Sequence, residues 1–266
     1  DKEAADAAGC MTKGIMNGSG LNGLLGLAGV ENLDEFFSAG AEDPIHLIGH
    51  MAGWVAGQTS AEVENPILKM YLGEETDGVM YIDPESLNEA NEPIIQFDAS
   101  IDGCLVTTEA APFNFTLPLE GVEIDVSLAE TQVIGKVGVA DNGITMSETT
   151  ISGYMTEELI TDLVTTLKEE CAGDTPPSLC AEGTVASIIS QPVESLVALL
   201  VPLLGSYDSL VNADGGVSEC EGAECNAVSV CLVIESTAQT VAGVAGAAAT
   251  TDETPAGDSG ADDGAG

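Results

Sequence analysis

Oxygen-bearing side chains gather in one short segment, residues 210–221, at a spacing that suits a hard cation. An EF-hand loop carries oxygen ligands at positions 3, 5, 9 and 12 and a glycine at position 6. If such a loop began at Leu210, Gly215 would take the glycine position, although Leu210 itself cannot bind a cation. The pattern predicts a calcium site, or else an ordinary acidic turn tied by Cys220. The candidate ligands are Asn212, Asp214, Ser218 and Glu221.

The two histidines of the chain, His46 and His50, form a second constellation. A helix is expected from Pro44 to about Gly57, because Asp43 and Pro44 make a good helix start and the segment is apolar nearly all round. Residues four apart on a helix point to one face, as in helical metal sites. The spacing predicts a transition-metal or haem site at the two histidines. The alternative is a pair of hydrogen-bonded histidines at the edge of the core.

Seven cysteines without a CxxC spacing favour disulfides and therefore an oxidising compartment. Cys171 and Cys180 flank a Pro-Pro loop, so a bridge between them would hold that loop. Cys220, Cys225 and Cys231 offer one further bridge, with Cys104 as a candidate partner for the third. The connectivity stays open, and the odd number leaves at least one thiol free or bound to another molecule. The chain starts at Asp1, which is typical of a processed mature protein.

The charge balance restricts the possible partners. The chain has 45 Asp and Glu against 5 basic residues, all of them Lys, for a net charge of −40. Nucleic-acid binding and polybasic membrane binding need many cationic side chains, so both are excluded. Cations and cationic or apolar protein surfaces remain as partners. A hydrolase with an unrecognised acidic site is an alternative that rests on the abundance of carboxylates alone.

Hydrophobic periodicity predicts an α+β fold, in which a central antiparallel β-meander has helices before and after it in sequence. Residues 1–20 are expected to form a flexible lead and residues 245–266 a disordered acidic tail. Between them, residues 21–244 are expected to form a single domain. Its predicted elements are helices within 21–72, strands within 79–152, helices within 156–205 and a strand over 226–235.

Two local signals support this assignment. Apolar and polar residues alternate over 122–128 and 133–139, and Asn142-Gly143 is typical of a tight hairpin turn. Thr156 followed by Glu157 and Glu158 is typical of a helix start, and Pro192 is expected to begin a later helix. The longest apolar run, 196–204, is too short for a transmembrane helix.

One resemblance rests on short motifs within about residues 94–240. Ile151-Ser152-Gly153-Tyr154-Met155 precedes a helix with an acidic start, a Cys-containing loop and an apolar helix, and then come Asp214-Gly215 and the segment 226–230. This order resembles uncharacterised secreted or lipoprotein-like proteins of myxobacterial type. Asn226 stands where that pattern has Asp, and Cys231 where it has Gly. The resemblance implies an extracellular or cell-envelope location and no established activity.

These features together predict a non-enzymatic, acidic protein of the extracellular space or cell envelope. It would have a structural or binding role, stabilised by disulfides and, in one interpretation, by calcium. The two alternatives are a transition-metal or haem protein that uses His46 and His50, and the hydrolase.

Overall fold

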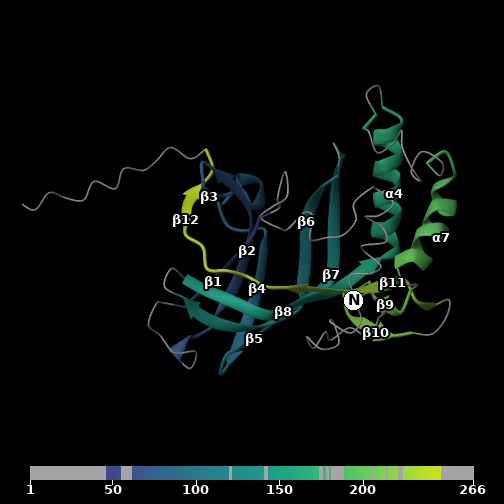
Figure 1. The fold of residues 1–266 in the computed structure, drawn as a ribbon. Helices are drawn as coiled ribbons and strands as arrows, with labels where there is room; N and C mark the ends of the chain where they lie inside the picture. Colours follow the sequence, from purple (N-terminus) through teal and green to yellow (C-terminus); the bar gives the residue numbers. More distant parts are fainter. Residues whose placement is uncertain are drawn as a thin grey trace, which may run out of the picture.

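The computed structural model describes residues 46–54, 62–119, 122–140, 143–173, 176–177, 180, 189–204, 207–213, 215–220 and 224–246. Within these residues, twelve strands form one mixed sheet, and two α-helices lie side by side near one end of it (Figure 1). The elements are β1 (His46–Ala52), β2 (Ile67–Thr76), β3 (Val79–Ile82), the 3-10 helix η2 (Pro84–Ser86), β4 (Ile95–Asp102), β5 (Leu105–Thr108), β6 (Ala111–Leu119), β7 (Val122–Ala140), β8 (Gly143–Thr156), α4 (Glu157–Cys171), α7 (Val193–Leu204), β9 (Ser209–Val211), β10 (Val217–Glu219), β11 (Ala227–Ile234) and β12 (Val241–Val244).

The sheet does not follow the chain order, so the predicted α+β meander is wrong. Its strand order is β10-β9-β11-β8-β7-β5-β4-β2-β3-β12, with β1 paired to β2 and β6 paired to β7. After β11 the chain crosses to the far end of the sheet, where β12 pairs with β3 in parallel (Figure 1). Pairings between strands distant in sequence depend on packing that short turn signals do not encode.

The helix predicted around the two histidines is also wrong in the described residues. His46–Ala52 forms β1, which pairs antiparallel with β2. Leu47 and Met51 share the face that carries the buried Leu68 and Met70 of β2. A short apolar run fits a strand with period two as well as a buried helix, and pairing with β2 decides between them. Residues 67–72, also predicted helical, lie in β2.

The long strands β7 and β8 carry two irregularities that increase their twist. In the first, Glu130 has a positive φ of 48° between the pairs Ala129–Tyr154 and Gln132–Ser152. In the second, Glu148 has the same φ, beside the pair Lys136–Ser147.

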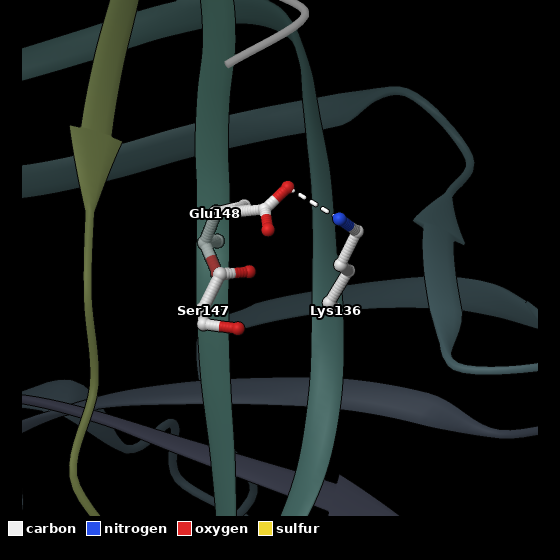
Figure 2. Close-up of polar contacts among 4 residues, drawn as sticks. Lys136, Ser147 and Glu148 are labelled. Atoms are coloured by element: carbon white, nitrogen blue, oxygen red, sulfur yellow. Dashed lines mark hydrogen bonds and ion pairs between the residues drawn. The ribbon is translucent and has the colours of Figure 1, made fainter.

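At the second irregularity, Lys136 Nζ reaches Glu148 Oε2 at 2.5 Å across the two strands (Figure 2). Both side chains are more than half exposed. An exposed pair of this kind contributes only about 0–1 kcal/mol, so it does not determine the strand pairing.

The two helices were predicted, and local signals determine where they start. The Thr156 hydroxyl accepts a hydrogen bond from the Leu159 N–H at 3.2 Å, which confirms the predicted N-cap. α7 begins directly after Pro192, also as predicted. None of the helices in the described part of the chain has the length and hydropathy needed to cross a lipid bilayer.

α4 and α7 run antiparallel. Lys168, near the end of α4, donates through Nζ to the carbonyl oxygens of Ile189 and Gln191, just before α7. At the opposite end, the Glu157 N–H donates to the Asn226 carbonyl at 2.8 Å, and the Asp208 N–H donates to the Ala227 carbonyl at 2.9 Å. The start of α4 and the segment after α7 are therefore held at the same end of β11.

The core lies between the helices and one face of the sheet. Ile160 and Val164 of α4 and Leu196 and Leu200 of α7 are buried. They belong to one cluster with apolar residues of the central strands, among them Leu128, Val133, Ile151, Met155, Val228 and Val230. A further pair, Phe97 and Phe113, stacks with ring centroids 6.4 Å apart. Burial of this apolar surface is the main force that holds the helices on the sheet.

Candidate functional site

The two histidines do not form a shared metal site in this fold. On a strand, residues four apart have Cα atoms about 13 Å apart, at about 3.3 Å per residue. One ion bound at about 2.1 Å by both rings needs a much closer approach. Instead, His46 Nε2 lies 3.8 Å from Glu75 Oε2. His50 is paired with Lys69, and burial together with that positive charge lowers the pKa of His50.

The predicted calcium segment is a β-hairpin rather than a loop between two helices. β9 and β10 pair antiparallel, and the Asn212 side chain donates to the Gly216 carbonyl at 2.8 Å. Ser218 lies in β10, while Asp214 and Glu221 lie outside the described residues. No group of three or more His, Cys, Asp or Glu within the described ranges is arranged to hold a metal ion.

The predicted bridge between Cys171 and Cys180 is present, and so is one of the pairings left open among Cys220, Cys225 and Cys231. Cys171 is bonded to Cys180 and Cys220 to Cys225, each pair with Cα atoms 5.4 Å apart. Cys231 is disulfide-bonded as well. Cys104 is an exposed free thiol, so the expectation that it completes a bridge is wrong. Cys104 lies in the tight turn between β4 and β5, beside Gly103 at a φ of 61°, and no other described cysteine lies within bonding reach.

Acidic groups also lie near Tyr154 of β8. Burial, followed by the charges of Asp208 and Glu130, raises the pKa of the Tyr154 phenol. Asp208 Oδ1 accepts from the Ser229 N–H at 2.9 Å and Oδ2 from the Ser229 hydroxyl at 2.5 Å. Both oxygens of Asp208 are thus occupied by the backbone and side chain of β11. This carboxylate joins the segment after α7 to the sheet, and the histidines lie on β1, far along the strand order.

The described residues do contain a groove that sequence reasoning missed. It runs along α7, has a volume of about 390 Å³ and lies between that helix, the first turns of α4 and Tyr207. Two rows of α7 residues with a spacing of four form one wall, and Glu157 and Thr161 of α4 belong to the other. The rows are Val193, Val197 and Val201, and Glu194, Ala198 and Pro202. Because the helices are antiparallel, Glu157 and Glu194 belong to opposite ends of the helix pair.

The groove is apolar between these two carboxylates. Glu157 and Glu194 are exposed, and neither takes part in an ion pair within the described ranges. Burial, followed by the negative charge of Glu157, raises the pKa of Tyr207 to about 12. The Tyr207 hydroxyl is buried and has no hydrogen-bond partner among the described groups. At neutral pH the ring is therefore an uncharged wall, and the charges of the groove come from its carboxylates.

One sequence signal could have indicated this site. α7 is apolar nearly all round, yet Ala198 and Leu199 are exposed, and Pro202 lies inside the helix. An apolar helix is usually buried on all sides. Here Leu196, Val197 and Leu200 are buried in the core and Val193 and Val201 pack against it, whereas Ala198, Leu199 and Pro202 are exposed. The remaining apolar face is available because no other described element packs over it.

Comparisons with known proteins do not place the chain in a family. The resemblance to myxobacterial secreted or lipoprotein-like proteins over about residues 94–240 therefore stays a prediction. The groove and its charges are the features from which a function can be inferred. No model of a protein family matches the chain, and no curated protein or solved structure is significantly similar to it.

Proposed function

We propose that this chain is a non-enzymatic, acidic protein of the extracellular space or cell envelope, and that it binds a small organic molecule in the groove between α4 and α7. The observation that carries the proposal is the groove itself, an open and mainly apolar depression of about 390 Å³. Binding sites for small molecules have volumes of about 300–1,000 Å³ and are lined mostly by apolar groups with a few polar ones.

The disulfides support the location. Cys171–Cys180 links the end of α4 to the segment before α7, and Cys220–Cys225 links the residue after β10 to the segment before β11. Structural disulfides persist in oxidising compartments and are rare in the cytosol. The net charge of −40 favours solubility and keeps anionic partners away, which also suits a secreted binding protein.

A binding role fits the groove better than catalysis does. A general base or nucleophile near a substrate needs a partner that tunes it, such as a histidine beside a serine. The groove carries two exposed carboxylates, a threonine and a neutral tyrosine, and both histidines lie on β1. The hydrolase alternative would need the carboxylates near Tyr154, but those of Asp208 are occupied by Ser229.

The groove can be tested with N-phenyl-1-naphthylamine, a neutral dye whose fluorescence rises in apolar sites. We expect the folded protein to enhance the dye and Ala198→Trp to remove most of the enhancement, because a large side chain on that wall fills the groove. Leu199→Trp is the matched control, since Leu199 is the next residue and lies on the exposed face outside the groove. Equal enhancement by wild type and Ala198→Trp would contradict the proposal.

The location can be tested by labelling thiols in the unfolded, unreduced protein and mapping the label by mass spectrometry. We expect Cys104 to react and the bonded cysteines, such as Cys171 and Cys220, to stay unlabelled. Labelling of all cysteines in protein isolated without reductant would contradict an oxidising compartment.

Calcium binding at the hairpin is a second proposal, and one observation favours it. Gly215 lies so close to β7 that a Cβ added there would come within 3.2 Å of Glu130 Oε1. A carboxylate therefore lies beside the turn that holds Asn212, which adds a hard oxygen ligand to the predicted set. Thermal melts with calcium, with magnesium and with a chelator test it. Specific binding raises the melting temperature at low calcium concentration, whereas charge screening acts alike with both metals.

A further inference from the structure

We propose that the α4–α7 groove selects linear organic dications, that is, aliphatic diamines or polyamines with an apolar stem between two ammonium groups. The inference rests on the proposed binding function and names the class of ligand. Three observations carry it: the position of the two carboxylates, the apolar surface between them, and the lack of any cationic side chain in the lining.

The carboxylates lie at opposite ends of the groove. Glu194 is in the first turn of α7, whereas Glu157 lies close enough to Tyr207, beyond the end of α7, to raise the pKa of its phenol. The part of α7 that lines the groove, Val193–Pro202, is about 14 Å long at a rise of 1.5 Å per residue. Two ammonium groups separated by roughly this length would each meet one carboxylate.

The surface between the carboxylates suits a hydrocarbon stem. Val197, Ala198 and Val201 line the middle of the groove, and the Tyr207 ring lines the end near Glu157. Burial of methylene groups contributes about 0.8 kcal/mol for each CH₂ that leaves water. The end near Tyr207 attracts a cation through the Glu157 carboxylate.

The charge of the lining excludes anionic ligands. No lysine lines the groove, and Lys168, the cation of α4, already donates to the carbonyls of Ile189 and Gln191. The positive ends of the two helix dipoles lie near Glu157 and Glu194 and reduce their attraction for a cation. That opposition is small at the start of α4, because the Glu157 and Leu159 N–H groups are bonded to Asn226 and Thr156.

The test measures binding of 1,8-diaminooctane by titration calorimetry at physiological ionic strength. Octylamine has the same eight-carbon stem with one ammonium group, and octan-1-ol has the same stem with none. An exposed ammonium–carboxylate contact is worth about 0.2–1 kcal/mol, so each lost contact weakens binding up to about fivefold. We expect the diamine to bind more tightly than octylamine, and octylamine more tightly than octan-1-ol.

Charge variants locate the effect in the groove. The double variant E157Q/E194Q is expected to weaken diamine binding about tenfold, to the level of octan-1-ol. The control E158Q/E170Q removes the same charge from exposed positions of α4 that do not line the groove. It is expected to change diamine affinity less than twofold. Circular dichroism and thermal melts verify that all variants are folded.

The outcomes separate this inference from the proposed function. If octan-1-ol binds as tightly as the diamine and A198W abolishes both, the groove is a binding site but the selectivity for dications is refuted. If E158Q/E170Q weakens diamine binding as much as E157Q/E194Q does, the attraction is a diffuse effect of the net charge and the inference is overturned. If neither compound binds and A198W leaves the fluorescent dye bound, the proposed function itself fails.

Discussion

Gly153→Ala is expected to destabilise the protein because β8 leaves no room for a side chain at this position. Gly153 is buried where β8 passes the irregularity at Glu130 of β7. A Cβ there would lie 2.5 Å from Thr131 Oγ1, 3.2 Å from Leu128 Cβ and 3.3 Å from the Ala129 carbonyl oxygen. The closest of these contacts is far below van der Waals distance, so a neighbouring group must move.

The magnitude follows from what can give way. Thr131 is fully buried, and its hydroxyl donates to the Leu128 carbonyl at 3.2 Å, so rotating it away breaks a buried hydrogen bond. Overpacking a core in this way costs about 1–3 kcal/mol. The upper end applies because the Ala129 backbone, which also contacts the added Cβ, cannot rotate away as a side chain can. Replacing glycine with alanine lowers the conformational entropy of the unfolded chain, which stabilises the folded state by about 0.5–1 kcal/mol. The free energy of unfolding should therefore fall by about 2 kcal/mol.

Urea unfolding followed by far-UV circular dichroism measures this change at constant salt. The matched control is Gly49→Ala in β1, where an added Cβ would meet only Leu68 Cδ1 at 3.8 Å, an ordinary contact. It should change stability by less than about 0.5 kcal/mol. A double-mutant cycle with Thr131→Ala tests the cause, because removing Oγ1 relieves the closest contact. The double variant should be at least about 1 kcal/mol more stable than the sum of the single effects.

Two results would refute the reasoning. Gly153→Ala as stable as Gly49→Ala would mean that β7 and β8 are not packed as closely as described. If Gly153→Ala lowers the free energy of unfolding strongly and its effect simply adds to that of Thr131→Ala, then Thr131 is not the group in conflict with the new side chain.

Four further predictions concern stability. Thr156→Ala should lower the free energy of unfolding by about 1 kcal/mol in urea titrations, because the Leu159 N–H loses its cap, while Thr156→Ser should retain most of it. Removing Cys171–Cys180 by double Ala substitution should cost about 2.6 kcal/mol for a sequence separation of 9, because the unfolded chain gains the entropy that the bridge removes; an unchanged urea midpoint would contradict this. Because the Thr150 hydroxyl is buried without a partner among the described groups, Thr150→Val should be neutral or stabilising in thermal melts, and a loss above about 1 kcal/mol would contradict this. Burial and Glu157 raise the pKa of Tyr207 to about 12, above about 10 in the unfolded chain, so its contribution is complete below pH 10 and is lost between about pH 10 and 12. Tyr207→Phe should weaken that alkaline decline in urea midpoints measured across this range, and an identical decline would contradict the raised pKa.

The sequence was sufficient where the signal is local. Thr156 has an oxygen that can cap a helix, and Glu157 and Glu158 follow it, so the start of α4 was predictable from its own residues. Apolar and polar residues alternate over 122–128 and 133–139, and both runs lie in the strand β7. The pairing of Cys171 with Cys180 was favoured because a short loop brings them together. The prediction that the chain does not bind nucleic acid rests on the charge balance alone and stays a prediction.

Only the tertiary structure decided the rest. His46 and His50 follow a pattern that suits a helix or a strand, and pairing with β2 made them strand residues too far apart to share an ion. β12 joins β3 across the whole chain, a contact that no nearby residue signals. The groove exists because α7 turns back along α4 and leaves one apolar face uncovered, which places Glu157 and Glu194 at its two ends. Hydrophobic burial is non-directional, so the residues of α7 determine that it packs, but the rest of the fold determines which of its faces stays open.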